Sequence, residues 1–142
     1  MDLRGNVTEQ RVGNGVVTTQ SFNEATGRIE SIKSYAQRFL FSQIQNLEYS
    51  WDTLGNLEER KELSGGKHLV ENFTYDALNR IESADLSNTL GTVTTTYQYD
   101  GFGNLQGKNF NDTYDYQYES QGVFNNRLHT VDNGNPFDRC QR

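Results

Sequence analysis

The chain has almost none of the residues that interrupt or cross-link a sheet, with one proline and one cysteine in 142 residues. Proline removes a donor from a strand ladder, so its scarcity leaves little to prevent strands from pairing along the whole chain. A single cysteine, Cys140, cannot form an internal disulfide. We therefore expect a fold that stands without covalent cross-links.

Long apolar runs and clusters of basic charge are also missing. No segment approaches the roughly 18 apolar residues of a membrane span, and the N-terminus begins in a turn motif rather than a signal peptide. The net charge is −6, and the 13 Lys and Arg residues are scattered. This charge balance argues against nucleic acid and anionic lipid as partners.

One short phrase recurs instead: an aromatic residue, Asp, two variable residues, Gly or Asn, Asn or Arg, and an aliphatic residue. The three clearest copies follow one another at intervals of 24 residues. Their aromatic residue, Asp, Gly or Asn, and aliphatic residue are Trp51, Asp52, Gly55 and Leu57 in the first copy, Tyr75, Asp76, Asn79 and Ile81 in the second, and Tyr99, Asp100, Gly103 and Leu105 in the third. Looser copies lie at 2–7, 22–29 and 118–128. A fixed period of this size is typical of a repeat protein, whose units bury their apolar faces by stacking.

The phrase has the chemistry of a tight β-turn. Asp at the first turn position can accept hydrogen bonds from backbone N–H groups ahead of it, and Gly adopts the left-handed conformation that produces a bulge. Asn79 replaces this Gly, and Asn is the residue that best tolerates positive φ after glycine. The repeat therefore reflects a backbone requirement.

Alternating residues before each turn predict half-buried strands, with the large side chains on one face. Two strands and two turns per repeat predict an all-β fold of roughly 10 to 12 strands, arranged as stacked β-hairpins in one twisted antiparallel sheet. The stretch 33–46 is less regular, and we expect there a strand pair with a long loop rather than a short helix. Residues 1–130 are predicted to form one domain of about six repeats, followed by a polar, frayed tail at 131–142.

These residues resemble the YD repeats of the RHS family, found in bacterial polymorphic toxins, insecticidal toxin complexes and animal teneurins. The phrases that carry the resemblance contain Tyr75-Asp76, Tyr99-Asp100 and Trp51-Asp52, and five or six copies in register cover nearly the whole chain. The resemblance implies a long spiralling sheet that closes into a hollow shell, which in the bacterial members holds a toxic domain. It also implies a secreted or cell-surface parent protein.

The resemblance does not imply an enzymatic activity for this chain. The family's self-cleaving core has an Asp-Pro-x-Gly-type signature, whereas the only proline here lies in Asn135-Pro136-Phe137-Asp138. We therefore expect a structural, non-catalytic segment of shell wall without a toxin domain.

The repeated aspartates are interpreted as turn caps, because equivalent residues of successive repeats are separated by one hairpin rather than converging across a cleft. No cofactor or metal site is expected, since neither His68 nor His129 has a partner at ligand spacing. One enzymatic alternative remains, a hydrolase in which carboxylates of non-adjacent repeats meet about 5 to 10 Å apart.

A binding role is the second alternative. Aromatic side chains on an open sheet can stack on sugars or accept peptide strands, and Tyr97 and Tyr116 are the candidate ligand-facing residues. This interpretation gives a carbohydrate- or protein-binding adhesion module.

We also expect the chain to pair with other YD repeats or with a second copy of itself. Strand edges and an apolar face invite pairing with other repeats of the parent protein or with a second copy in a homo-oligomer.

Overall fold

The structure is a computed structural model that describes residues 1–36, 42–110, 112–117, 119, 120, 123, 124, 128 and 130–132. Within these residues every regular element is a strand, apart from one 3-10 turn, η1 (Ser64–Gly66). The strands are β1 (Glu9–Arg11), β2 (Val16–Phe22), β3 (Ile29–Ala36), β4 (Ser42–Trp51), β5 (Leu57–Glu62), β6 (Leu69–Tyr75), β7 (Ile81–Asn88), β8 (Gly91–Tyr99), β9 (Leu105–Phe110), β10 (Asp112–Gln117), β11 (Glu119–Ser120), β12 (Val123–Phe124) and β13 (Thr130–Asp132).

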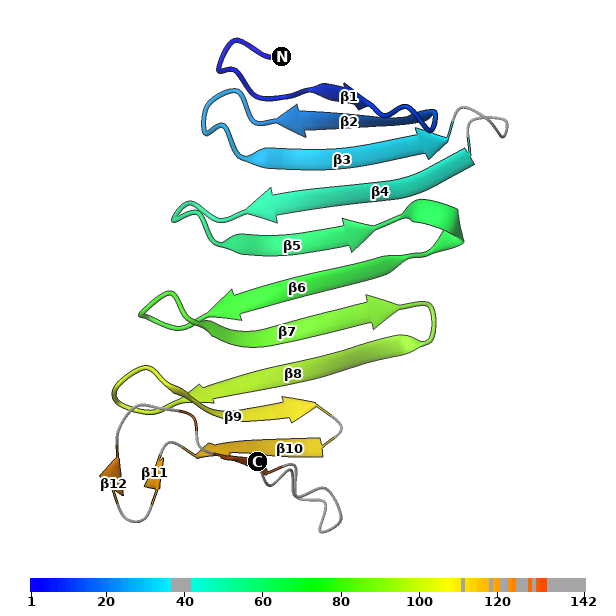
Figure 1. Ribbon diagram of the computed structural model, residues 1–142. Helices are drawn as coiled ribbons and strands as arrows, with labels where there is room; N and C mark the ends of the chain where they lie inside the picture. The colour runs from blue at the N-terminus through cyan, green and yellow to red at the C-terminus, as the bar shows by residue number, and fades with distance from the viewer. Residues whose placement is uncertain are drawn as a thin grey trace. The chain divides into compact units, whose positions relative to one another are not determined.

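The predicted fold class is confirmed. Strands β1 to β10 follow one another in chain order in one sheet, and β13 lies beside β10 (Figure 1). The strand pairs are antiparallel throughout the recorded registers. Eleven described strands in this sheet agree with the expected 10 to 12, and the sequence did not predict the additional pair β11–β12.

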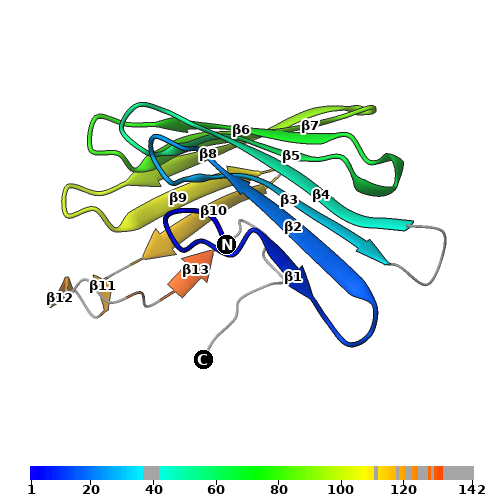
Figure 2. The ribbon, with the colours of Figure 1, turned by 90° about the horizontal axis from the view of Figure 1, so that it is seen from above.

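The chain divides into two compact units. Unit 1 consists of Met1–Phe73 and Leu86–Thr92, and unit 2 consists of Thr74–Asp85 and Val93–Arg142. Unit 1 contains β1 to β5, and Figure 2 shows the direction of these strands rotating from β2 to β5, as the twist of antiparallel strands requires. In unit 2, β8, β9, β10 and β13 pair in succession.

A β-bulge accompanies the repeated turns. In the β4–β5 pair, Ser50 lies opposite Glu59 and Trp51 lies opposite Leu57, which leaves Glu58 as the extra residue. The same shift occurs before the turns that join β2 to β3 and β8 to β9, where the extra residues are Glu30 and Gln106. All three extra residues are polar and exposed. The bulge expected from the turn chemistry is therefore present.

Strands occupy most of the irregular stretch 33–46, as expected. β3 extends to Ala36 and β4 begins at Ser42, and the two strands pair with a register shift at Ser34 and Tyr35. The connection between them, 37–41, lies outside the described residues. The same is true of 133–142, most of the predicted tail, so the proposed domain boundary stays a prediction.

The sheet has no conventional core. Within the described residues, no apolar side chain is fully buried, and the buried residues are Ser34, Ser64 and Thr95. Ser34 lies in a row of cross-strand polar contacts, at 2.9 Å from the Thr18 hydroxyl and 3.2 Å from Gln45 Oε1. The large apolar residues of the described part are therefore half-buried or exposed.

Candidate functional site in the repeated turns

The Asp of each phrase caps its own turn. Asp52 Oδ1 accepts hydrogen bonds from the backbone N–H groups of Gly55 at 2.6 Å and Asn56 at 2.8 Å. Its Oδ2 accepts a bond from the Asn56 side-chain amide at 2.9 Å. The backbone closes the loop as well, because the Asp52 N–H donates to the Asn56 carbonyl at 3.0 Å. One carboxylate thus satisfies most of the donors that the turn exposes.

The same geometry recurs in the turns of Asp2 and Asp100. Asp2 Oδ2 accepts from the Asn6 side-chain amide at 2.8 Å, and Asp100 Oδ2 accepts from that of Asn104 at 2.9 Å. In each turn the backbone N–H of this Asn donates to Oδ1 of the Asp at 2.9 Å. The Asn at the sixth position of the phrase is therefore a functional part of the turn.

Two turns are variants of this pattern. Arg80 replaces the Asn in the turn between β6 and β7, and its guanidinium binds Asp76 Oδ2 through Nε at 2.7 Å and through Nη2 at 2.7 Å. The turn between β2 and β3 is one residue longer and uses Asn23 in place of Asp. Asn23 Oδ1 accepts from the backbone N–H of Thr26 at 2.9 Å.

These hydrogen bonds keep the turn carboxylates ionised. The Asn104 side chain, followed by its backbone N–H, lowers the pKa of Asp100, and Asn6 acts in the same way on the pKa of Asp2. At Asp76 the main cause of the lowered pKa is the Arg80 backbone N–H. At Asp52, desolvation opposes the hydrogen bonds from Asn56 and Gly55, and the pKa is still lowered.

The left-handed position of the phrase has the predicted conformation. Gly55 has φ of 103° and Gly103 has φ of 89°, and Asn79, which stands in the same place, has φ of 59°. Asn79 is the one residue other than glycine with positive φ among the described residues. The substitution of Asn for Gly in this copy thus follows the backbone geometry.

In two phrases the aromatic residue binds the preceding repeat. Trp51 Nε1–H donates to the carbonyl oxygen of Ile29 at 2.7 Å. In unit 2, the Tyr99 hydroxyl donates to the carbonyl oxygen of Ile81 at 2.9 Å. Ile29 and Ile81 hold the same place, the aliphatic residue that ends the preceding phrase, so the two contacts are equivalent.

Arginine side chains form a second link between consecutive turns. Arg4 Nη2 donates to the carbonyl oxygens of Glu24 at 2.7 Å and Ala25 at 2.9 Å in the next turn. Arg28 Nη1 donates to the carbonyl oxygen of Asp52 at 3.2 Å. In unit 2, the Arg80 guanidinium lies 4.5 Å from the ring centroid of Tyr99, a cation–π contact.

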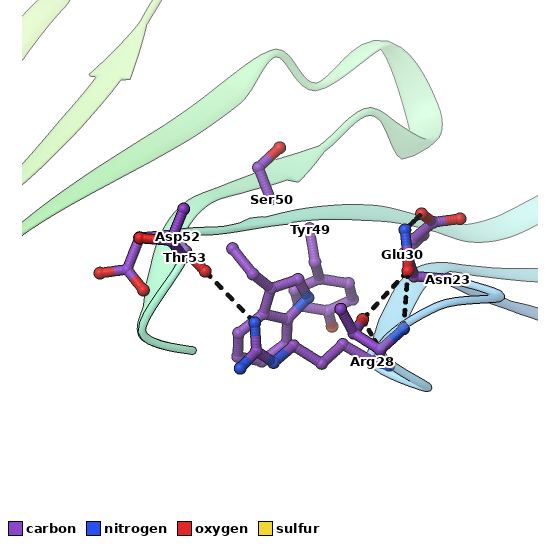
Figure 3. Close-up of a pocket in the computed structure, with 9 residues that line it drawn as sticks. Asn23, Arg28, Glu30, Tyr49, Ser50, Asp52 and Thr53 are labelled. Carbon is purple, nitrogen blue, oxygen red and sulfur yellow. Dashed lines mark hydrogen bonds between the residues drawn. The ribbon is translucent and has the colours of Figure 1, made fainter.

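A pocket of about 560 Å³ opens between the turns of unit 1. Figure 3 shows Arg28 reaching the backbone of Asp52 across this pocket, and Asn23 bonded to Glu30 at its other end. The pocket is lined by Asn23, Thr26, Arg28, Glu30, Tyr49, Ser50, Trp51, Asp52 and Thr53. Aromatic rings beside amide and carboxylate groups are suited to a polar ligand such as a sugar.

The predicted ligand-facing tyrosines are not brought into this pocket. Tyr97 is half-buried in β8, and the Lys108 ammonium lies 5.8 Å from its ring centroid. Tyr116 lies in β10, where its backbone pairs with Val131, and its side chain is outside the described atoms. A ligand-binding role for these two residues remains a proposal.

No metal centre is found in the part of the chain that the structure describes. That part holds no group of three or more His, Cys, Asp or Glu residues that could bind an ion. His68 is exposed after η1, and His129 and Cys140 lie outside the described residues. Within the described ranges there is also no helix with the length and hydropathy of a membrane span.

Sequence reasoning found the turn caps but missed the contacts between repeats. The side-chain bond from Asn56 to Asp52, the Trp51 bond to Ile29 and the Arg28 bond to Asp52 were not predicted. Each joins positions of the repeated phrase, so placing copies one period apart side by side would have suggested them.

Comparisons with known proteins agree with this fold. No protein-family model and no curated protein matches the chain, whereas several solved structures do. The crystal structure of TcdB2-TccC3-Cdc42 matches 88% of this chain at 22% identity with a TM-score of 0.73. The Photorhabdus luminescens Tc holotoxin pore with a mutation in TccC3 matches 85% at 21% identity with a TM-score of 0.69. The crystal structure of TcdB2-TccC3-TEV matches 87% at 21% identity with a TM-score of 0.67.

This chain spans 7% of the length of each matched chain. At such identities the likeness establishes a shared fold, which is consistent with an RHS/YD-repeat fragment. The stacked hairpins of this chain therefore have the fold that its resemblance to the RHS/YD-repeat family implied.

Proposed function

We propose that this chain is a structural, non-catalytic wall segment of an encapsulating shell within a larger secreted or surface toxin-like protein. The observation that carries the proposal is the linkage between consecutive repeats. The aromatic residue and the arginine of the repeated phrase bind backbone atoms of a neighbouring repeat, as Trp51 and Arg28 do. Side chains used in this way hold hairpins side by side, which is the task of a wall.

The exposure of the apolar residues supports the same conclusion. In a single layer whose described part has no fully buried apolar side chain, one face must be covered by something else to be stable in water. The matched toxin-complex chains are far longer than this segment. We infer that other repeats, or the contents of the shell, cover this face in the whole protein.

The turn carboxylates are poorly suited to catalysis. A general acid needs a raised pKa, whereas the pKa values of Asp52 and Asp100 are lowered and both oxygens of each group accept hydrogen bonds from their own turn. This chemistry favours turn formation over proton transfer.

The wall function can be tested in the natural protein that contains this segment. Electron cryomicroscopy should show residues 1–132 as part of a continuous wall around an interior that holds polypeptide. Trp51→Ala, which removes a contact between repeats, should increase proteolysis of the enclosed polypeptide. Thr53→Ala, at an exposed turn position two residues away, is the matched control and should leave protection unchanged. An appendage outside any shell, or equal protection in both variants, would contradict the proposal.

A carbohydrate-binding adhesion module is the second candidate, favoured by the pocket that contains Tyr49 and Trp51. Glycan-array binding that Tyr49→Ala abolishes would place the ligand in this pocket. Binding that Tyr97→Ala or Tyr116→Ala abolishes would instead place it on the tyrosines predicted from the sequence. Absence of glycan binding in the intact chain would remove this candidate.

Self-association is also proposed, through the sheet edges or the apolar face. Light scattering over a range of concentrations should show a homodimer or a higher oligomer of the isolated chain. A strict monomer at high concentration would contradict this expectation.

A further inference from the structure

Glycines in the repeated turns lie against an arginine of the preceding turn. A Cβ atom added at Gly27 would stand 3.0 Å from Arg4 Nη1, and one added at Gly55 would collide with the Arg28 guanidinium. In unit 2, a Cβ atom at Gly103 would stand 3.9 Å from Nη1 of Arg80. At Gly27 and Gly55 the absence of a side chain therefore makes room for a guanidinium as well as for a positive φ, whereas the distance at Gly103 is an ordinary contact.

Gly5 is the exception. It has the same place in the Asp2–Asn6 turn and the same left-handed conformation, with φ of 84°. A Cβ atom added there would have no neighbour within 4 Å. The turn thus has the space that its counterparts fill with arginine.

The oxygen atoms that would accept hydrogen bonds from a guanidinium in this space are also present. In the equivalent turn the Asp52 carbonyl oxygen binds Arg28, and the corresponding atom here is the carbonyl oxygen of Asp2. The Asp2 carboxylate adds a negative charge, since the pKa of this group is lowered by Asn6. Next to the turn, β1 is fully exposed and pairs with β2 on one side, so its other edge is available for a further strand.

We propose that the Asp2–Asn6 turn is a docking socket for the guanidinium of an arginine, supplied by a further hairpin of the same repeat that adds beside β1. The inference rests on the wall function only in naming a hairpin as the occupant. The socket itself rests on the equivalence of Gly5 with Gly27 and Gly55.

The chemistry favours arginine over other cations. A planar guanidinium fits flat against a residue without a side chain and can donate to two carbonyl oxygens at once, as Arg4 does to Glu24 and Ala25. A lysine ammonium would supply charge without this shape. Backbone pairing along β1 would align the incoming hairpin so that its turn lies over the socket.

In the test, the hairpin that would add beside β1 is fused to the N-terminus of the chain. A second copy of residues 28–51 is fused directly before Asp2, in place of Met1. The copied arginine then precedes the Asp2 turn by one repeat, as Arg28 precedes the Asp52 turn. Four proteins form a double-mutant cycle, in which the copied Arg28 is kept or replaced by Arg28→Gln, and Gly5 is kept or replaced by Gly5→Ala.

Urea unfolding gives the stability of each of the four proteins. With Gly5 in place, we expect Arg28→Gln in the copy to lower the unfolding stability constant by about threefold to tenfold, the range for a partly exposed charged hydrogen bond. With Gly5→Ala, the effect should fall below about twofold, because the added methyl group fills the socket. Contacts of the copied arginine outside the socket are present in both backgrounds and cancel. Equal effects of Arg28→Gln in both backgrounds would overturn the proposal.

A second measurement does not depend on the folding of the extended chain. In the unextended chain, methylguanidinium chloride should shift the backbone amide resonance of Gly5 more than those of Gly27 and Gly55, whose spaces already hold arginine. Methylammonium chloride at the same concentration is the control and should produce no such difference. Equal shifts at the three glycines would overturn the proposal.

The identity of the occupant is tested separately. Sedimentation of the unextended chain is compared with that of Gly5→Ala over the same concentrations. We expect identical self-association, because association through the apolar face or through paired strand edges does not require an arginine in the socket. If Gly5→Ala removes self-association, the occupant is a second copy and the assignment to a preceding hairpin is wrong. The wall function is judged independently, from protection of enclosed polypeptide in the natural protein.

Discussion

Tyr99→Phe removes one oxygen atom and tests whether aromatic residues hold consecutive repeats together. The Tyr99 hydroxyl donates to the Ile81 carbonyl oxygen at 2.9 Å, and the ring lies 4.5 Å from the Arg80 guanidinium. Phenylalanine keeps the ring and its contact with Arg80 but loses the donor. Partial burial raises the pKa of Tyr99, so the hydroxyl carries its proton at neutral pH. The variant therefore isolates one hydrogen bond.

The expected loss follows from the usual net value of such a bond. A neutral intramolecular hydrogen bond contributes about 0.5–1.5 kcal/mol, and the Ile81 carbonyl, on a half-buried residue, loses this partner. We expect the free energy of unfolding to fall by about 1 kcal/mol. The apolar surface buried by the ring hardly changes, so the urea m value should stay the same.

Tyr97→Phe is the matched control. Tyr97 lies two residues earlier in the same strand, also half-buried and also beside a cation, Lys108. Its hydroxyl makes no hydrogen bond recorded within the described residues. The free energy of unfolding should change by less than about 0.5 kcal/mol, the usual range for sites without a specific contact.

Urea unfolding followed by far-ultraviolet circular dichroism measures both variants. The midpoint of Tyr99→Phe should lie below that of the parent chain, and the midpoint of Tyr97→Phe should lie close to it. Equal shifts in the two variants would refute the reasoning, because the loss could not then be assigned to the bond between repeats. An unchanged midpoint for Tyr99→Phe would refute it as well.

Three further predictions concern the turns and the sheet surface. In urea unfolding, Gly55→Ala should lower the free energy of unfolding by about 1–3 kcal/mol, because φ is 103° and the new methyl group would meet Arg28. Gly101→Ala is the control, and because its methyl group would stand in open space it should lower the free energy of unfolding by less than about 0.5 kcal/mol. The pKa of Asp100 is lower in the folded than in the unfolded chain, where it is near 3.8, so its stabilisation is complete above that pH and is lost as the pH falls through the lower folded value. Acid titration of stability should therefore show a shallower slope below pH 3.8 for Asp100→Asn than for the parent, and equal slopes would exclude this cause. Arg60→Gln, which breaks the cross-strand ion pair with Glu71, should change urea stability by less than about 0.5 kcal/mol because both side chains are partly exposed, and a larger loss would show that the pair is structural.

The sequence predicted the fold because its strongest signals are local. The 24-residue period, the Asp of each turn and the Gly or Asn after it depend on backbone geometry within five residues. Asn79 is the clearest case, since its place in the phrase predicted the positive φ that the structure shows. Turn chemistry of this kind can be interpreted without knowledge of the rest of the molecule.

The contacts between repeats could not be predicted from such local signals. Whether Arg28 reaches the next turn depends on the rotamer of a long side chain and on the distance between two hairpins. Arg80 shows the difficulty, because it replaces an Asn, binds its own Asp76 and also faces Tyr99 in the next repeat. The buried Ser34 row was missed for a related reason, since small polar residues in a strand are usually assigned to the solvent face.

A single layer of hairpins explains why polar contacts link the repeats. Without a second layer, no apolar side chain of the described residues is fully buried, so the hydrophobic effect supplies less directional constraint than it does in a sandwich. The bonds from Trp51 to Ile29 and from Tyr99 to Ile81 run between one phrase and the one before it, and thus fix each hairpin relative to its neighbour. The two links have the same form although they lie two repeats apart, and an array held by such links can be lengthened without redesigning its ends. A wall whose extent is set by the number of repeats requires this property, whereas an active site, which needs unlike residues to converge at one place, does not benefit from it.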